Sequence, residues 1–184
     1  MLTTPCITAI VGDFGSCKTL LMTALASMYQ HEYKIFANYT LIGIKYTKIN
    51  FEYLAEFPDE LRNAIVLIDE SSVSMNAYDV FKKDVRKISN FIIQIRKRNI
   101  YMFYTIQRWN RSAITLRELT KYFYEMLATE VSGVALIKVY NQFEDETLVS
   151  ETVFDGRRFF GMYDTEEIIK TKEKNEISQK PLTQ

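Results

Sequence analysis

The sequence predicts an α/β domain with a mostly parallel central sheet, helices on both faces and a C-terminal β-meander. Two patterns lead to this class: apolar strands alternate with helical segments, and a group of turn-separated strands follows near the end. The length agrees, because 184 residues with a hydrophobic content of 47% suit one domain with a sizeable core. We expect one domain over residues 1–169 and a polar tail over residues 170–184.

The first third of the chain contains the clearest strands. Short apolar runs at residues 6–11, 34–38 and 64–68, the first of them rich in β-branched side chains, predict buried strands. Apolar residues at helical spacing predict a helix over residues 18–29, and a shorter helical stretch is expected within residues 49–61. The order strand, helix, strand is typical of a parallel sheet.

The second part continues this alternation and then changes. An apolar stripe predicts a long helix over residues 79–98, an apolar run predicts a strand over 100–106, and a serine that can cap a helix favours a helical segment over 112–121. After that, turn-like stretches separate three short runs, which predict the strands of a meander at residues 122–130, 134–140 and 147–154.

The balance of basic and acidic residues excludes a strong overall electrostatic field that would by itself indicate nucleic-acid binding. The chain has 23 basic and 23 acidic residues. However, nine basic residues and a single acid, Asp84, lie between Lys82 and Arg111. This asymmetry predicts one basic face, for which a solvated helix surface is the alternative reading.

Cysteine content and hydropathy bear on the cellular setting. Two cysteines, Cys6 and Cys17, form no disulfide framework and match no zinc spacing, which fits a reducing, intracellular environment. The N-terminus lacks the pattern of a signal peptide, and no apolar run approaches the roughly 20 residues that a membrane span needs. We expect a soluble protein with no membrane span.

A glycine-containing turn between the first strand and the first helix carries the strongest functional signal. Residues 12–19 read Gly-Asp-Phe-Gly-Ser-Cys-Lys-Thr and resemble the phosphate-binding P-loop G-x-x-x-x-G-K-[ST]. Inward N–H groups and a helix N-terminus bind polyphosphate, Lys18 reaches the β and γ phosphates, and the Thr19 hydroxyl binds Mg²⁺. Cys17 replaces the second glycine. The candidate ATP-binding residues are Gly12, Asp13, Phe14, Gly15, Ser16, Cys17, Lys18, Thr19 and Leu20.

Two acids follow the apolar strand at residues 64–68. Asp69 is the candidate Mg²⁺ ligand, acting through the water shell of the metal, and Glu70 is the candidate general base for the attacking water. A solvent-facing acidic turn is a common alternative. The order of the two motifs, each directly after a buried strand, favours a P-loop NTPase with ATP and Mg²⁺ as cofactors.

Further catalytic candidates lie around the strand at residues 100–106. Gln107 ends this strand, where its amide could sense the γ-phosphate or orient the water. Arg96 and Arg98 precede the strand, and either could act on the ATP of a neighbouring subunit, with Arg117 as a further candidate. Cations that complement a helix C-terminus are the alternative.

Five segments in order carry a resemblance to a known family. The chain resembles the viral genome-packaging ATPases of the FtsK–HerA superfamily, especially those of archaeal viruses, and the related Zot-like proteins. The match covers roughly residues 6–168 and is poorest at Cys17. The segments are residues 12–19, 35–39, 67–70, 94–107 and 163–167.

The resemblance implies a RecA-like fold and a homo-oligomeric, hexameric ring that moves double-stranded DNA into a viral capsid or portal vertex by ATP hydrolysis. It implies Gln107 as a sensor, Arg96 or Arg98 as the arginine acting in trans, and a place in the host cytoplasm or on the virion. Three alternatives stay open. They are a Zot-like assembly or secretion ATPase, a small nucleotide or nucleoside kinase, and a P-loop protein that only binds nucleotide.

Overall fold

The computed structural model describes residues 2, 4–69, 94–109 and 114–165. Within these ranges the side chains of a few helical residues in 51–55 and 114–115 are left aside. The acid Glu70, most of the helix expected over residues 79–98 and the tail expected over 170–184 lie outside the described residues. Residues 94–97 are helical, in agreement with the end of that expected helix.

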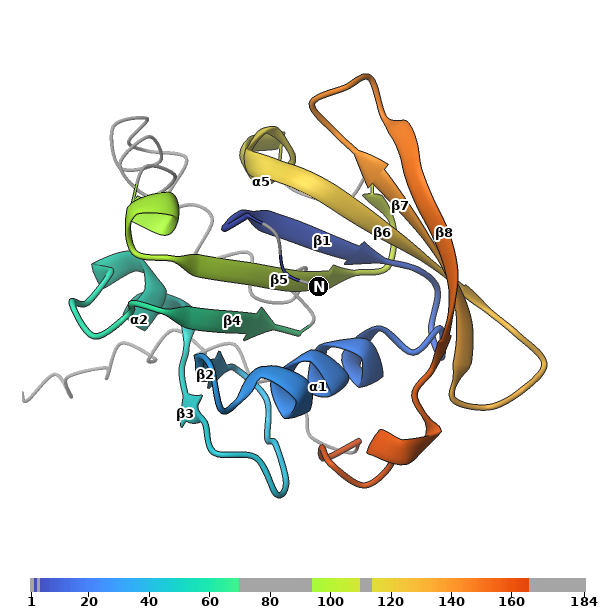
Figure 1. The fold of residues 1–184 in the computed structure, drawn as a ribbon, viewed down its shortest axis with the longest axis horizontal. Coiled ribbons are helices and arrows are strands. Elements are labelled where there is room, and N and C mark those ends of the chain that lie inside the picture. The colour runs from blue at the N-terminus through green and yellow to red at the C-terminus, as the bar shows by residue number, and fades with distance from the viewer. Residues whose placement is uncertain (1, 3, 70–93, 110–113, 166–184) are drawn as a thin grey trace, which may run out of the picture.

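The core of the fold is one eight-stranded sheet with the strand order β3-β2-β4-β5-β1-β6-β7-β8 (Figure 1). Every pairing from β3 to β6 is parallel, and β7 and β8 are added antiparallel. The strands are β1 (Ile7–Val11), β2 (Lys34–Ala37), β3 (Thr47–Lys48), β4 (Ala64–Ile68), β5 (Ile100–Ile106), β6 (Thr120–Ala128), β7 (Val134–Asn141) and β8 (Thr147–Asp155).

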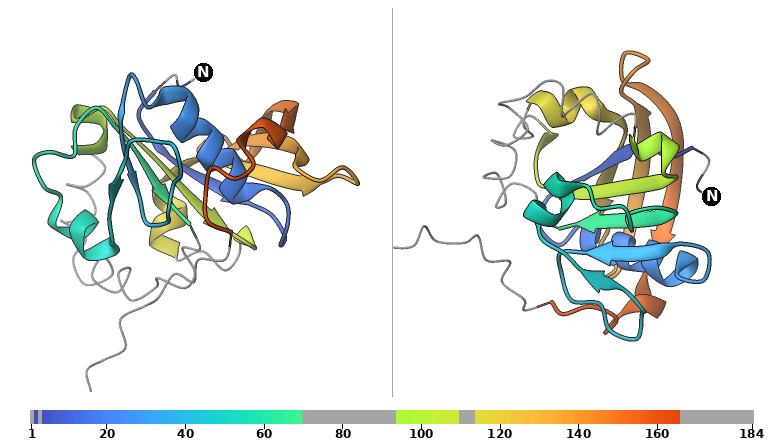
Figure 2. Two further views of the ribbon diagram at one scale, coloured as in Figure 1. Left: turned by 90° about the horizontal axis from the view of Figure 1, so that it is seen from below. Right: turned by 90° about the vertical axis from the view of Figure 1, so that its left-hand side faces the viewer.

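Helices cover both faces of the sheet, as predicted (Figure 2). Helix α1 (Lys18–Tyr29) packs on one face, and α2 (Phe51–Glu56) and α5 (Ile114–Leu119) lie on the other. None of the described helices combines the length and the apolar character needed to cross a bilayer.

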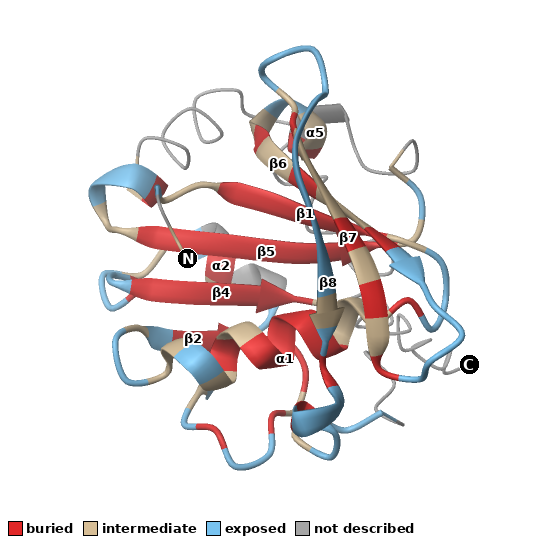
Figure 3. Ribbon diagram, turned by 45° about the vertical axis from the view of Figure 1, so that its right-hand side comes forward, coloured by how far each residue is buried: buried red, intermediate tan, exposed pale blue. Residues whose placement is uncertain are grey.

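The central strands are buried on both faces (Figure 3). All residues of β1, β4 and β5 are buried, which explains why these strands read as continuous apolar runs. Alternate side chains serve different faces: Tyr101 and Phe103 pack with the α1 side of the core, and Met102 and Tyr104 with the side of α2 and α5.

The register of the parallel strands brings four strand ends to one edge. Val11 pairs with Ile106, Ile68 with Tyr104 and Ala37 with Leu67. The residues that follow these strands therefore meet at the same edge, which is where parallel α/β sheets bind ligands. Predicted nucleotide-binding residues from distant parts of the sequence are brought together there.

The predicted meander forms and continues the central sheet. Strand β6 lies between β1, with which it pairs in parallel, and β7, with which it pairs antiparallel. The helix predicted over residues 112–121 ends at Leu119, and Thr120 already belongs to β6. The Thr120 hydroxyl donates to the Leu116 carbonyl at 2.7 Å and bonds the Tyr104 hydroxyl at 2.9 Å, which fixes the change from helix to strand.

Two short elements had no sequence signal. Strand β3 has two residues, and the 3-10 helix η2 (Arg157–Phe159) has three. Neither is long enough to show a periodicity.

Candidate nucleotide-binding site

The turn between β1 and α1 is tightly packed against β6. A Cβ atom at Gly12 would lie 2.5 Å from Ser16 Oγ and 2.6 Å from the Met126 carbonyl oxygen. Only glycine fits at this contact, because real Cβ atoms do not approach backbone oxygens so closely. The first glycine of the motif is therefore required by the approach of two chain segments.

Two side-chain donors of this turn bond the same oxygen atom, the carbonyl of Asp13. Lys18 Nζ donates to the Asp13 carbonyl at 2.7 Å, and Ser16 Oγ donates to the same oxygen at 2.8 Å. Lys18 also begins helix α1, so its ammonium adds to the partial positive charge of the helix N-terminus. A phosphate oxygen is a stronger acceptor for these donors than a neutral carbonyl, so the turn suits an anion.

Asp69 joins the turn to two strands. Thr19 Oγ1 donates to Asp69 Oδ2 at 2.9 Å, and Thr105 Oγ1 donates to Asp69 Oδ1 at 2.6 Å. Asp69 follows β4 and the turn follows β1, and strand β5 lies between these two strands. The Asp69 side chain therefore reaches the turn across the face of β5 that is covered by α1. Both oxygens of the carboxylate thus have defined positions.

The backbone of Asp69 is held as well. Asn38 Nδ2 donates to the Asp69 carbonyl at 2.9 Å, and the Asp69 N–H donates to Asn38 Oδ1 at 2.7 Å. Asn38 directly follows β2 and is 8% exposed. These two bonds extend the pairing of β2 and β4 beyond their last residues and keep the acid at the strand edge.

A cavity of about 300 Å³ opens above this arrangement. Its walls include residues 14–19 of the turn together with Asp69, Thr105, Gln107 and Tyr163. Gln107 and Thr105 are two residues apart along an extended chain, so their side chains point to the same face of the sheet, and both line the cavity. The predicted sensor and the predicted metal ligand therefore line one site.

The residues present fit a magnesium ion and a polyphosphate. Mg²⁺ prefers oxygen ligands and is usually bound by one or two carboxylate or hydroxyl groups plus substrate phosphates. Thr19 and Asp69 offer such oxygens 2.9 Å apart, beside the donors of the turn. Thr19 and Asp69 are thus the residues that would hold a metal ion, and the turn is the part that would hold the phosphates.

No protein-family model matches the sequence, and no curated protein matches it. Solved structures do match. The N-terminal domain of zonular occludens toxin from Neisseria meningitidis has a TM-score of 0.65 at 17% identity, with 88% of this chain and 100% of that chain covered. The genome-packaging NTPase B204 of Sulfolobus turreted icosahedral virus 2, in complex with ATPγS, has a TM-score of 0.56 at 12% identity, covering 82% and 97%.

A third match is the conjugation coupling protein TcpA of pCW3, in its monomer form with ATPγS. Its TM-score is 0.53 at 11% identity, and the alignment covers 83% of this chain and 60% of that chain. The chain has a P-loop NTPase fold. The predicted likeness to Zot-like and genome-packaging proteins is thus confirmed at the level of the fold.

Cys17, the departure from the P-loop pattern, keeps the backbone conformation that a glycine would adopt. Its φ is 66°, in the left-handed region, and Gly15 also has a positive φ of 74°. A non-glycine residue in this region costs roughly 1–2 kcal/mol. The side chain packs against two apolar clusters, and this burial raises the pKa of the Cys17 thiol, while a hydrogen bond with the Gly133 backbone and the charge of Lys18 lower it. Cys17 therefore takes the left-handed backbone conformation that a glycine adopts most easily.

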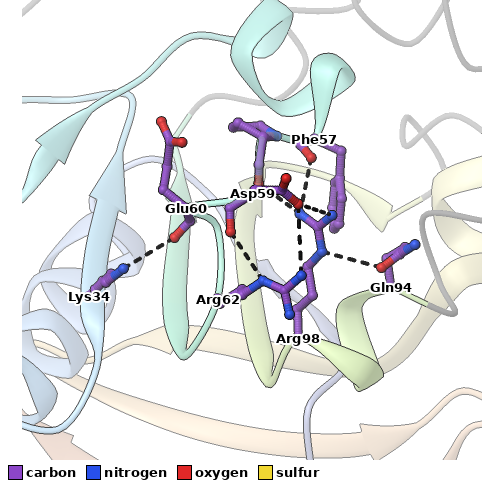
Figure 4. Close-up of polar contacts among 8 residues, drawn as sticks. Lys34, Phe57, Asp59, Glu60, Arg62, Gln94 and Arg98 are labelled. Atoms are coloured by element: carbon purple, nitrogen blue, oxygen red, sulfur yellow. Dashed lines mark hydrogen bonds and ion pairs between the residues drawn. The ribbon is translucent and has the colours of Figure 1, made fainter.

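Arg98 makes contacts within its own chain (Figure 4). Its guanidinium donates to the carbonyls of Phe57 at 3.0 Å and Pro58 at 2.7 Å and to Gln94 Oε1 at 3.2 Å. The side chain is 10% exposed, contacts Asp59 Oδ1 at 3.2 Å, and stacks over the Phe57 ring at 4.5 Å. These contacts give Arg98 a structural role, namely to anchor the loop that follows α2. Its catalytic role stays a prediction.

The other predicted arginines lie in different surroundings. Arg96 is exposed and, like Arg98, precedes β5, at the sheet edge opposite the P-loop. Arg117 on α5 is half-buried, and its Nε atom has no hydrogen-bond partner among the described residues. Neither lines the cavity of its own chain, so a catalytic role would require the site of a neighbouring subunit. The general base candidate Glu70, and Arg111 of the basic segment, lie outside the described residues.

Some residues at the site had no role assigned from the sequence, and four of them contribute contacts that shape it. They are Asn38, Tyr39, Thr105 and Tyr163. A usable signal existed for the first three, because each follows or ends a buried strand at the edge where Asp69 and Gln107 lie. Tyr163 begins the segment 163–167 that carries the family resemblance, but its place at the site depends on contacts between segments more than 100 residues apart.

Proposed function

We propose that this protein is an ATP-hydrolysing motor that translocates double-stranded DNA into a viral capsid. The observation that carries the ATP site is the contact of Thr19 with Asp69 at 2.9 Å, which joins the P-loop to an acidic strand end. The DNA and capsid parts are supported by the match to a genome-packaging NTPase, and DNA handling also by the match to a conjugation coupling protein.

Each part of the site has a task in this proposal. The P-loop amides and Lys18 would bind the phosphates, and Thr19 with Asp69 would hold a magnesium ion, which would neutralise phosphate charge when bound. Asn38 holds the backbone of Asp69 and Thr105 holds its carboxylate, so that little reorganisation is needed when the nucleotide binds.

Water activation and sensing complete the reaction. Glu70 would take a proton from the attacking water, and Gln107, which lines the cavity, would orient that water or sense the γ-phosphate. Among the described residues that line the cavity, Lys18 is the single basic side chain. An arginine from a neighbouring subunit, with exposed Arg96 as the first candidate, would supply further positive charge in the transition state.

A ring, most simply a hexamer, would place such an arginine and would surround the DNA. A motor of this kind grips the phosphate backbone without reading bases, so it needs positive charge and no base contacts. The exposed residues Arg96, Lys97 and Arg108 of the basic segment are suited to this task. Work at a capsid or portal vertex would place the protein in the host cytoplasm or on the virion.

The deciding experiment is the rate of ATP hydrolysis with and without double-stranded DNA, together with a native mass measurement. We expect DNA to stimulate hydrolysis by a ring-sized species, and Lys18→Ala to abolish it. Lys34→Ala, at the opposite sheet edge, serves as the matched control. An unchanged rate in Lys18→Ala would remove the site assignment, and a monomer without DNA stimulation would contradict the motor.

A Zot-like assembly or secretion ATPase is the second candidate. It is favoured by one observation: the N-terminal domain of zonular occludens toxin matches with a TM-score of 0.65 over 100% of its length, against 0.56 for the packaging NTPase with ATPγS. Such a protein would hydrolyse ATP at the same site but would gain no rate from DNA. ATP hydrolysis that depends on Lys18 and ignores DNA would favour this reading.

A further inference from the structure

The chain after η2 returns to the P-loop region as a strap, which we define as residues 160–165 (the end of the red ribbon in Figure 1). It pairs antiparallel with the segment that follows β2. The Ile42 N–H donates to the Met162 carbonyl at 2.8 Å, and the Asp164 N–H donates to the Thr40 carbonyl at 3.2 Å. Between them, Leu41 and Tyr163 form an isolated β-bridge.

The start of the strap is fixed by packing. Phe159 is 5% exposed and packs on Leu20 and Ala24 of the helix that carries the P-loop lysine. The Phe160 ring fills the space beside Gly133, where an added Cβ would lie 2.4 Å from a ring atom. The strap is therefore held at both ends, and its course past the site is determined.

Tyr163 is set against the P-loop helix by a second tyrosine. Its ring meets that of buried Tyr39 edge to face, with centroids 6.4 Å apart at 88°. The Tyr39 hydroxyl bonds Thr23 Oγ1 at 3.3 Å, and Thr23 in turn donates to the Thr19 carbonyl at 2.9 Å. These contacts fix the position of the Tyr163 ring while leaving it half-buried, as a wall of the nucleotide cavity.

The part of the cavity that Tyr163 borders is the metal end. Asp69 lines the same cavity, and burial together with the charge of Asp69 raises the pKa of Tyr163. A tyrosine hydroxyl carries its proton at neutral pH and can donate a hydrogen bond. Asp69 would hold the metal ion, which would neutralise charge on the terminal phosphates, so a donor at this end of the cavity lies toward the terminal phosphate and not toward the base.

We propose that Tyr163 is a nucleotide-contacting residue whose hydroxyl donates a hydrogen bond to the terminal phosphate of bound ATP. This inference rests on the proposed ATP site. It gives the strap a function, because a contact to the γ-phosphate exists with ATP and is absent with ADP. Tyr163 would then contribute to the preference of the site for the triphosphate.

The test compares Tyr163→Phe with the unchanged protein in equilibrium binding of a non-hydrolysable ATP analogue and of ADP, both with Mg²⁺. Phenylalanine keeps the ring contact with Tyr39 and removes only the hydroxyl, so the fold is preserved. Removing a hydrogen bond to a charged group lowers the binding affinity for the ligand by about tenfold or more. We expect this loss for the analogue and no change for ADP.

Tyr53→Phe is the matched control. It removes a hydroxyl that bonds Glu60 at 3.1 Å outside the cavity, and it should leave both affinities unchanged. Equal affinities for the analogue in Tyr163→Phe and unchanged protein would overturn the inference, as would an equal loss for the analogue and ADP. Failure of the ATP site itself gives a different result, namely no binding to the unchanged protein or full binding to Lys18→Ala.

Discussion

The side chain of Asn38 pairs with the main chain of Asp69 in the way that another strand residue would. The amide donates to the Asp69 carbonyl at 2.9 Å and accepts from its N–H at 2.7 Å. The acid is thereby fixed through its backbone by β2 and through its carboxylate by Thr19 and Thr105. Groups that orient a metal ligand in this way affect metal affinity without touching the metal.

The first prediction concerns this pair. Asn38→Ala leaves two backbone groups of Asp69 without their partners, and we expect a loss of about 2 kcal/mol in the free energy of unfolding. The Mg²⁺ concentration needed for half-maximal ATP hydrolysis should rise about tenfold. Magnesium titrations of the hydrolysis rate and denaturant unfolding measure the two effects.

Asn141→Ala provides the control for Asn38→Ala. Asn141 is also buried, at 7% exposure, and it accepts from the Phe143 N–H at 3.2 Å, away from the cavity. Asn141→Ala should lower the free energy of unfolding and leave the Mg²⁺ dependence of ATP hydrolysis unchanged. If both variants shift only stability, Asn38 has no part in metal binding.

The second prediction concerns the general base. Glu70→Gln should leave ATP bound and slow hydrolysis by about 10²–10⁴-fold, because the amide cannot accept the proton of the water. Binding of a labelled ATP analogue and single-turnover hydrolysis measure the two properties. Loss of binding would indicate that Glu70 has a structural role instead.

The third prediction separates Arg98 from Arg96. Arg98→Ala removes a largely buried guanidinium together with its hydrogen bonds to the carbonyls of Phe57 and Pro58, so we expect a loss of about 2–3 kcal/mol in unfolding free energy. Arg96→Ala removes an exposed side chain and should change stability by less than about 0.5 kcal/mol. Denaturant unfolding of both variants tests this difference.

Catalysis in trans by Arg96 is tested by mixing subunits, which is the fourth prediction. Arg96→Ala and Lys18→Ala subunits should each be inactive alone. In a mixed ring, an intact P-loop can meet an intact arginine from its neighbour, so activity should partly return. No recovery in mixed rings of confirmed stoichiometry would argue against a trans role for Arg96.

The fifth prediction uses the left-handed backbone of Cys17. A β-branched residue is strongly disfavoured there, so Cys17→Val should lower the unfolding free energy by about 2 kcal/mol and weaken ATP binding. Cys17→Gly keeps the conformation without strain and should bind ATP at least as tightly as the unchanged protein. Thermal unfolding and nucleotide titration distinguish these outcomes. Tight binding by Cys17→Val would show that the loop tolerates another shape.

Most of the sheet could be predicted from the sequence, for a physical reason. The strands β1, β4 and β5 are buried on both faces, so their composition alone identifies them. Helix α1 was predicted with its observed bounds, residues 18–29, because its apolar residues recur at helical spacing. The P-loop and Asp69 were predicted because each follows such a strand.

What the sequence by itself determined is therefore local: the elements, the P-loop and the acid at the end of β4. Tertiary structure decided what is non-local. Four contacts join segments that are far apart in the chain. Strand β6 pairs with β1, Asn38 bonds Asp69, Arg98 bonds the loop after α2, and Tyr163 pairs with Leu41 beside the cavity. Periodicity reports which face of an element is buried, whereas the partner that covers that face is chosen only when the whole chain packs.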